Sequence, residues 1–142
     1  MTPTLTLLDK PDGAAAQAIY APLLAFNNEN SGHPFDGKTL VITVAAPDSS
    51  EVVGGLWGST SYGWLHVDML IVPATLRRQG LGTQLMRMAE EEALRRGCIG
   101  SYLDTFDFQA RGFYERLGYT LFGALDGMPP GHQRFFLSRK FA

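Results

Sequence analysis

The feature of this sequence that most constrains its fold is a strand-like run that leads through a basic, glycine-containing loop into an amphipathic helix. The apolar run WLHVDMLIV covers residues 64–72, the loop contains RRQGLGT at 77–83, and the helix is expected over residues 81–96. Within the helix, apolar residues recur at the spacings of three and four that give it one buried face, namely Leu81, Leu85, Met88 and Ala89. The segment therefore predicts a helix that packs its apolar side against the strand before it.

Further strand-like and helical runs surround this segment. Strands are expected at 39–46, 51–58, 98–106, 119–125 and 132–141, with a short helix at 108–117. Near the N-terminus, Asp12 can cap a helix that starts at Gly13, and Pro22 is expected to kink it or split it in two. Residues 27–38 are interpreted as a surface loop, and one strand is expected before the first helix. This order predicts an α/β (α+β) fold with a mixed central sheet and packed helices, as a single domain over residues 1–142.

The composition excludes several classes of protein. With 142 residues, 45% of them hydrophobic, the chain is long enough for one domain with a sound core. It has no apolar run of about 18 residues that could span a membrane, and no signal peptide is recognised. The single cysteine, Cys98, rules out an internal disulfide and is interpreted as a packed thiol. These features predict a cytoplasmic location in a reducing environment.

The charge of the chain is small but unevenly distributed. The formal net charge of −2 argues against a nucleic-acid-binding or membrane-binding protein. Residues 1–76 carry two bases against seven acids, whereas residues 77–142 carry ten bases, nine of them arginine, against seven acids. The basic half suggests an anionic ligand, although a chance imbalance on solvated faces explains the same numbers. Since His33, His66 and His132 lack metal-ligand spacing, no metal is expected.

The loop before the helix has the properties of a phosphate-binding site. The first N–H groups of a helix lack intrahelical partners, and the helix dipole favours negative charge at this end. Gly80 and Gly82 would let a phosphate approach the backbone, while Arg77 and Arg78 add positive charge where acidic residues normally occur. The spacing matches neither the P-loop nor the dinucleotide-binding pattern. A glycine-containing turn without a ligand is the alternative.

Two motifs in this order resemble those of the GNAT superfamily of N-acetyltransferases. Arg77-x-x-Gly80-x-Gly82, which follows the strand DMLIV, is similar to the loop with which that family holds the pyrophosphate of acyl-CoA. The segment DFQARGFYERLGY at 107–119 resembles the family pattern N-x-x-A-x-x-x-Y-E-K-L-G-F, with Asp107 in place of the usual asparagine. The resemblance is strong over residues 64–122 and loose before residue 60, and it implies acetyl-CoA as the cosubstrate.

The resemblance also implies a particular sheet and a set of cofactor contacts. The strands at 65–72 and 99–105 would run parallel and splay apart, with helices on both faces of the sheet. The pantetheine arm would lie in the gap beside the backbone of Leu70, Ile71 and Val72. The pyrophosphate would contact the loop residues, and the pantetheine and thioester would contact the second motif; these positions are Arg77, Arg78, Gln79, Gly80, Leu81, Gly82 and Thr83, then Asp107, Ala110 and Phe113.

The same resemblance suggests catalytic roles for two side chains. Tyr114 matches the tyrosine that in the family usually protonates the leaving thiolate, although a core aromatic would fit this position too. Strand alternation places Asp68 on one face with His66, Leu70 and Val72. Asp68 is therefore a candidate for removing the ammonium proton or attracting a cationic acceptor, with a solvated or ion-paired carboxylate as an equal alternative.

The resulting hypothesis is an acetyl-CoA-dependent N-acetyltransferase that moves an acetyl group to a primary amine by direct attack on the thioester. The acceptor would be a small molecule or a peptide, and the sequence leaves its identity and a homodimer open. Asp104 is a less favoured candidate for the base, and His132 could reach an acceptor pocket, although a structural histidine in a turn is the favoured interpretation. A non-catalytic acyl-CoA or phosphate-binding module is the main alternative, since it needs the loop but not Tyr114. An interaction domain without a ligand would leave the arginines and glycines of the loop unexplained.

Overall fold

The computed structural model describes residues 1–142, and its contacts divide them into two compact units, 1–35 and 36–142. The first unit contains one helix, α1 (Gly13–Ser31), which is preceded by residues without helix or strand. The Asp12 carboxylate accepts a hydrogen bond from the N–H of Ala15 at 3.1 Å, which caps the helix as predicted. Gly32 ends the helix with a φ of 72°, a conformation that favours glycine.

Two expectations for the N-terminal residues are wrong, namely the loop that was expected to begin at residue 27 and the strand before α1. The helix includes residues 27–31, and it continues past Pro22, where a kink or a split was expected, as one helix. Near the end of the helix, Asn30 donates to the carbonyl of Phe26 at 2.8 Å, and Asn28 accepts from the N–H of Phe35 at 2.9 Å. The strand expected before α1 is also absent from the structure, since residues 1–12 pair with no strand.

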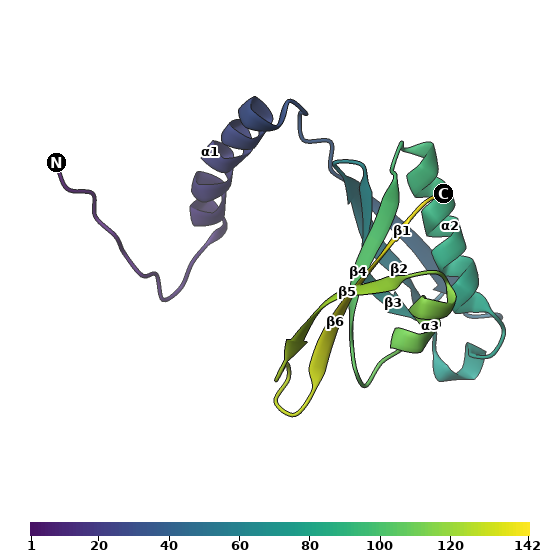
Figure 1. The fold of residues 1–142 in the computed structure, drawn as a ribbon. Coiled ribbons are helices and arrows are strands. Elements are labelled where there is room, and N and C mark those ends of the chain that lie inside the picture. The colour runs from purple at the N-terminus through teal and green to yellow at the C-terminus, as the bar shows by residue number, and fades with distance from the viewer. The chain divides into compact units, whose positions relative to one another are not determined.

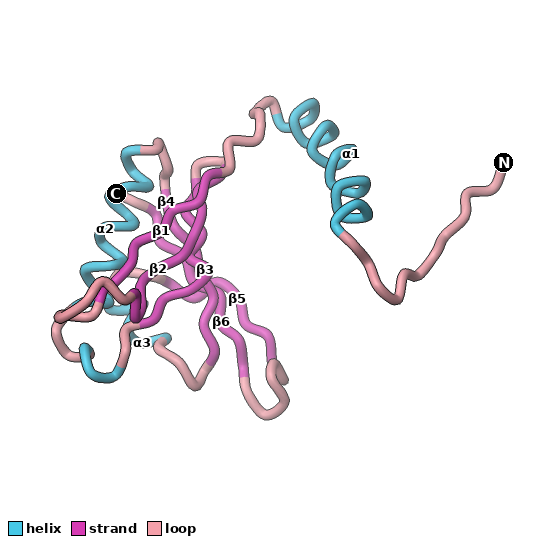
Figure 2. Tube along the Cα trace, turned by 180° about the vertical axis from the view of Figure 1, so that it is seen from behind, coloured by secondary structure: helices cyan, strands magenta, loops and turns pink.

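The second unit is built on a six-stranded sheet with the order β1-β2-β3-β4-β6-β5 (Figures 1 and 2). β3 and β4 form the one parallel pair, and all other neighbours are antiparallel. The predicted mixed sheet is confirmed, with strand ends that differ from the expectations by a few residues. The strands are β1 (Lys38–Ala45), β2 (Val52–Ser61), β3 (Trp64–Ile71), β4 (Gly100–Phe106), β5 (Thr120–Asp126) and β6 (Gln133–Lys140).

One face of the sheet forms the core with α2 (Leu81–Arg95) and α3 (Arg111–Arg116), and a short 3₁₀ helix, η1 (Ala74–Leu76), links β3 to α2. α2 supplies Leu85, Met86 and Ala89 to a cluster that also contains strand residues and Tyr114 of α3. Met88, which was expected on the buried face, is 52% exposed, and Met86 is buried in its place. Leu65 and Leu137 in this cluster are completely buried. Truncation of such a leucine to alanine costs about 2–5 kcal/mol, so this core holds the sheet and both helices together.

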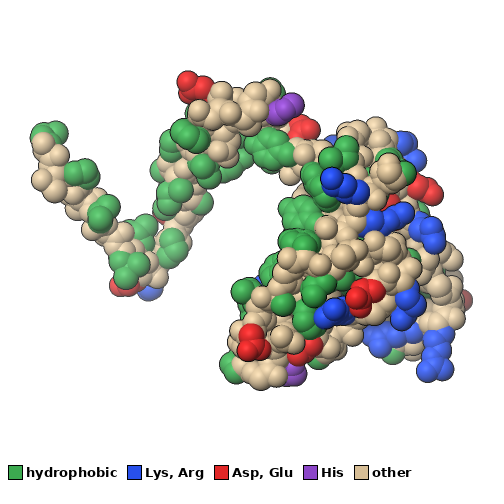
Figure 3. All heavy atoms as spheres, viewed as in Figure 1, with side chains coloured by type: hydrophobic (Ala, Val, Ile, Leu, Met, Phe, Trp, Pro, Cys, Tyr) green, Lys and Arg blue, Asp and Glu red, His purple; other side chains and the backbone are tan.

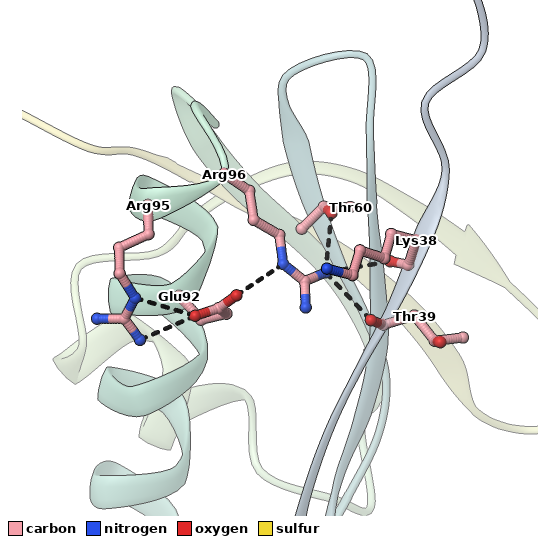
Figure 4. A network of polar contacts seen from close by, with 6 residues as sticks. All are labelled: Lys38, Thr39, Thr60, Glu92, Arg95 and Arg96. Carbon is pink, nitrogen blue, oxygen red and sulfur yellow. Dashed lines mark hydrogen bonds and ion pairs between the residues drawn. The ribbon is translucent and has the colours of Figure 1, made fainter.

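Polar networks fasten the helices to the sheet. At the C-terminal end of α2, the Arg96 guanidinium bonds Glu92 at 2.9 Å and reaches the carbonyl of Thr39 and the hydroxyl of Thr60, both at 3.1 Å (Figure 4). Farther along the helix, the buried Glu90 accepts from the hydroxyl of Tyr119 and from Arg139, each at 2.7 Å. Buried polar groups need such partners, and the networks fix the position of α2 on the sheet.

The structure contains no helix with the length and hydropathy required to cross a bilayer. It also contains no group of three or more His, Cys, Asp or Glu side chains arranged to hold a metal ion. The single cysteine, Cys98, is buried and unpaired, and burial raises the pKa of its thiol.

Candidate active site

The parallel strands β3 and β4 separate part-way along their length. Their pairing ends at Val67 with Leu103, although β3 continues to Ile71 and β4 to Phe106. Beyond that point, each strand presents a backbone edge that the other does not pair with. The predicted splayed pair is therefore present, and it opens a gap lined by N–H and C=O groups that can bind an extended ligand.

A β-bulge lies in β3 just where the strands separate. β2 pairs Trp57 with Met69, but its next residue, Gly58, pairs with Val67. Asp68 is therefore the extra residue on β3. A bulge of this kind leaves one residue unpaired and bends the strand, so it turns the second half of β3 away from β4.

The bulge also corrects the expectation that His66, Asp68, Leu70 and Val72 share one face. Leu70 and Val72 pack against the core. His66 and Asp68 lie together away from it, with His66 Nδ1 at 2.6 Å from Asp68 Oδ1. The expectation fails because one extra residue reverses the side-chain alternation of everything that follows it in the strand.

The N-terminus of α2 is left open for an anion. No side chain caps it, and its first turn contains no acidic residue. Gly80 precedes the helix with a φ of 73°, and Arg78 adopts a φ of 65°, a conformation that a residue with a side chain rarely takes. A Cβ added to Gly82 would lie 3.1 Å from the ring of Phe113. Unsatisfied N–H groups and Arg77 thus stand together at one helix end (Figure 3 shows Lys and Arg side chains gathered over this end).

A cavity of about 1120 Å³ connects the gap between the strands, the loop before α2, and α3. Its volume slightly exceeds the range of roughly 300–1,000 Å³ typical of ligand sites, as a long ligand would need. Gln79 and Asp107 are the two predicted site residues that do not line it. The others do: Asp68, Leu70, Ile71, Val72, Arg77, Arg78, Gly80, Leu81, Gly82, Thr83, Ala110, Phe113 and Tyr114.

Asp107 instead holds two segments of the chain together. One of its carboxylate oxygens lies 2.8 Å from Nδ1 of His132, and the other accepts a hydrogen bond from the N–H of Gln133 at 3.0 Å. These bonds tie the turn between β5 and β6 to the end of β4. His132 therefore lies beside the second motif, although 25 residues separate it from Asp107 in the sequence.

Other cavity residues were not predicted from the sequence. The rings of Phe106 and Phe108 stack with centroids 5.2 Å apart, and Gln109 accepts a hydrogen bond from the N–H of Phe106 at 2.8 Å. Phe108 and Gln109 lie inside the second motif, so the motif itself was the signal for them. Asp104, a weaker candidate from the sequence, also lines the cavity, and its pairing with Arg134 at 2.7 Å was not predicted. No local pattern predicts that pair, because its members are 30 residues apart.

Tyr114 lies where the core meets the cavity. Its side chain is 9% exposed, and its ring packs edge-on against Phe113 with centroids 5.0 Å apart. No protein group hydrogen-bonds its hydroxyl. Burial raises the pKa of Tyr114 to about 12, and the negative charge of Asp104 adds to the effect. The hydroxyl therefore stays protonated across the physiological range and can donate a proton into the cavity.

Residues 10–119 match the model of the family described as the Acetyltransferase (GNAT) family. The chain belongs to the GNAT acetyltransferase family. The match covers most of the chain, including both motifs from which the resemblance was inferred, so the predicted family, fold class and acetyltransferase activity are confirmed.

Individual relatives of this GNAT acetyltransferase agree with the assignment. It is 43% identical to acetyltransferase Atu2258 of Agrobacterium fabrum over 135 residues, which cover 95% of this chain and 97% of that protein. It is 48% identical to blasticidin-S acetyltransferase of Streptomyces morookaense over 90 residues, 63% of this chain and 66% of that one. A crystal structure from Agrobacterium tumefaciens superposes with a TM-score of 0.88 at 41% identity, covering 97% of this chain and 99% of the other.

Proposed function

We propose that this GNAT acetyltransferase transfers the acetyl group of acetyl-CoA to a primary amine of a cationic small molecule or a peptide. The observation that carries the proposal is that the uncapped N-terminus of α2 and the side chain of Tyr114 line one cavity. Acyl transfer from a thioester with a pyrophosphate needs an anion site and a proton donor within reach of one ligand.

The residues around the cavity fit acetyl-CoA. The pyrophosphate would accept hydrogen bonds from the free N–H groups at the start of α2 and would be neutralised by Arg77 and Arg78. The absence of a side chain at Gly82 keeps that helix end accessible beside Phe113. The pantetheine would lie along the unpaired edge of β3, whose length beyond Val67 offers the backbone groups of an open strand.

In the proposed reaction, the chain supplies two proton transfers. The amine nitrogen attacks the carbonyl carbon of the thioester, the carbon–sulfur bond breaks, and the Tyr114 hydroxyl gives its proton to the departing sulfur. The nitrogen then loses its extra proton, which passes through water to the Tyr114 oxygen, so the product is a neutral amide and Tyr114 is protonated again. Asp68 accepts the proton of the ammonium, directly or through water, before the attack. His66, whose Nδ1 lies 2.6 Å from Asp68, orients the carboxylate. Binding both substrates in one cavity supplies the proximity on which such transfers depend.

The acceptor end of the cavity, by which we mean the part lined by Asp68 and Asp104, has charges that support a cationic acceptor. Two carboxylates line the cavity there, and Arg134 neutralises one of them, Asp104. Asp68 has only His66 as an ionic partner, so it keeps negative charge available for an ammonium group. The name of the relative blasticidin-S acetyltransferase gives independent support for a small-molecule acceptor.

The test is a screen for acetyl-CoA-dependent release of free thiol over polyamines, aminoglycosides, nucleoside antibiotics and peptides. We expect release with a cationic amine and acetylation of that amine by mass spectrometry. Binding of acetyl-CoA without thiol release from any amine would identify a binding module instead of an enzyme.

Asp68→Asn decides the role of this carboxylate. If Asp68 is the base, kcat should fall by roughly 10²-fold and the acidic limb of the pH–rate profile should change. If Asp68 only attracts the cation, KM for the amine should rise while kcat is kept. Asp126→Asn, at an exposed aspartate outside the cavity, is the control. Wild-type values of kcat and KM across pH in Asp68→Asn would exclude both roles.

A further inference from the structure

Arg134 and Asp104 form an ion pair in the wall of the cavity, within the unit 36–142. Two nitrogens of Arg134, Nε and Nη2, lie 2.8 and 2.7 Å from one oxygen of Asp104, Oδ1. The side chains of Arg134 and Asp104 are 28% and 22% exposed, so the pair is largely shielded from solvent. The charge of Asp104 is therefore neutralised by the protein itself. A carboxylate can accept about four hydrogen bonds, so its other oxygen, Oδ2, can still accept one from a ligand.

Asp104 lies on the same face of the sheet as Asp68. Tyr102 and His66 are paired in register across β4 and β3, and their rings pack with centroids 4.6 Å apart. His66 also bonds Asp68. Asp104 follows Tyr102 by two residues of β4, so its side chain points to the same face as that ring. The acceptor end of the cavity thus has two carboxylates with different partners, a histidine for Asp68 and an arginine for Asp104.

Two aromatic rings hold the Arg134 guanidinium against Asp104. Its Cζ lies 5.3 Å from the ring centroid of Phe106 and 5.5 Å from that of Phe136, distances at which a ring face attracts a cation. These residues lie on the paired strands β4 and β6, so the sheet itself sets the arrangement. An arginine with these contacts is already ordered before a ligand arrives, and it is a fixed part of the cavity wall.

We propose that Arg134 determines which acceptors this site prefers, namely amines whose second polar group is a neutral hydrogen-bond donor over amines with a second ammonium. The inference rests on the proposed function, because it assigns groups of the acceptor to residues of that site. Asp68 would bind the reacting ammonium, and Oδ2 of Asp104 would accept from a hydroxyl or an amide N–H. A second ammonium at Asp104 would meet the Arg134 guanidinium, and two like charges so close together repel each other.

The test compares a series of linear diamines with the amino alcohols of the same chain lengths. The measured quantity is the diamine preference, which is kcat/KM for the diamine divided by kcat/KM for the amino alcohol. Comparing this ratio between variants cancels the statistical advantage of two reactive amines. Calorimetric affinities of the same compounds, measured in the presence of CoA, give a second diamine preference that does not depend on turnover.

Substitutions of the two partners should move the diamine preference in opposite directions. Arg134→Met should raise it roughly tenfold, because the second ammonium can then pair with Asp104. Asp104→Asn should lower it below the wild-type value, because the positive charge of Arg134 then has no partner. The double variant should return toward the wild-type value, and Arg134→Lys, which keeps the charge, should stay near it. A merely structural pair would not give these opposite shifts.

Arg111→Met is the matched control. Arg111 also pairs with a carboxylate, that of Glu115 at 3.3 Å, and its Cζ lies 4.5 Å from the ring centroid of Phe135. It does not line the cavity. Its loss should therefore leave the diamine preference unchanged, and a change as large as that in Arg134→Met would overturn the inference.

The inference and the proposed function fail in different ways. Affinities that shift as expected without acetylation of any amine would support the inference and overturn the proposed function. Acetylation with the same diamine preference in wild type and in the folded Arg134→Met and Asp104→Asn proteins would overturn the inference alone. Absence of binding by every compound of the series would also overturn it. Should Arg134→Met fail to unfold cooperatively on heating, the direction of the shift in Asp104→Asn decides the inference.

Discussion

The two ends of helix α2 both have arginine side chains nearby, but they differ in whether the polar groups of the helix end have partners within the protein. At the C-terminal end, the Arg96 guanidinium bonds Glu92, Thr60 and the carbonyl of Thr39, so its donors have protein partners (Figure 4). At the N-terminal end, the helix has no capping side chain and no acidic residue. Both ends have arginines with protein partners, since Arg77 Nε donates to the carbonyl of Val72 at 3.0 Å, but at the N-terminal end no side chain bonds the first N–H groups of the helix.

This difference separates the end of α2 that stabilises the fold from the end that is suited to bind a ligand. A saturated network fixes the helix on the sheet, whereas the uncapped N–H groups at the other end, with two arginines beside them, are suited to bind an anionic ligand. The sequence breaks the usual rule that acidic residues occupy the first turn, and such violations are expected at functional sites. Substitutions at the N-terminal end should therefore affect binding, and substitutions at the C-terminal end should affect folding.

Gly82→Asp should have the largest effect, because it places negative charge at the open helix end. We expect affinity for acetyl-CoA to fall by roughly 100-fold or more, since like charges then oppose each other at the anion site. Isothermal titration calorimetry gives the affinity. Gly82→Ala is the control for size: its Cβ would crowd the ring of Phe113 without adding charge, so its loss should be smaller. A folded Gly82→Asp protein with wild-type affinity would show that α2 does not bind the pyrophosphate.

Tyr114→Phe should leave cofactor binding intact and reduce kcat by roughly 10²-fold, the contribution of a general acid. The pKa of Tyr114 is raised to about 12, so the acid is still protonated at pH 10, where an ordinary tyrosine is half ionised. Ionisation of Tyr114 should therefore cause no decrease in the wild-type kcat below pH 10. A basic limb between pH 8 and 10 that disappears in Tyr114→Phe would contradict this assignment.

Arg96→Met should have the smallest effect on function and a clear effect on folding. We expect the free energy of unfolding in urea to fall by about 1.5–3 kcal/mol, the contribution of a hydrogen bond to a charged group. Arg95→Met is the matched control, because Arg95 is exposed and pairs only with Glu92, so its loss should cost less than about 1 kcal/mol. Acetyl-CoA affinity should be unchanged in both variants. Reduced affinity in Arg96→Met would mean that the two ends of α2 are not independent.

The stability lost in Arg96→Met and Arg95→Met should depend on pH, and the pKa of Glu92 gives the direction. Hydrogen bonds from Arg96, and then from Arg95, lower the pKa of Glu92 below its ordinary value of 4.5. Stability from this interaction is therefore present above pH 4.5 and is lost as the pH falls through the lowered pKa. Wild type should lose more stability than Arg96→Met over this acidic range, measured by thermal unfolding. Equal losses would show that Glu92 gains nothing from Arg96.

Much of the site was predictable because it is encoded in short segments. The loop at 77–83 and the residues Ala110, Phe113 and Tyr114 lie in two continuous motifs, and the structure brings nearly all of them to one cavity. Contacts between distant segments were not predictable. Asp107 meets His132, and Asp104 meets Arg134, across 25 and 30 residues of sequence. Such contacts depend on which strands become neighbours, and a local pattern does not contain that information.

The sequence by itself determined the elements and the chemistry of the open helix end. Helix periodicity, the Asp12 cap and the paired glycines act over a few residues, so their physics is local. Only the tertiary structure decided where Asp68 points, because the bulge arises from how β2 and β3 pair. It also decided where the parallel strands separate, and thus where the cavity opens, because the length of β3–β4 pairing depends on the packing of the whole sheet and not on either strand alone.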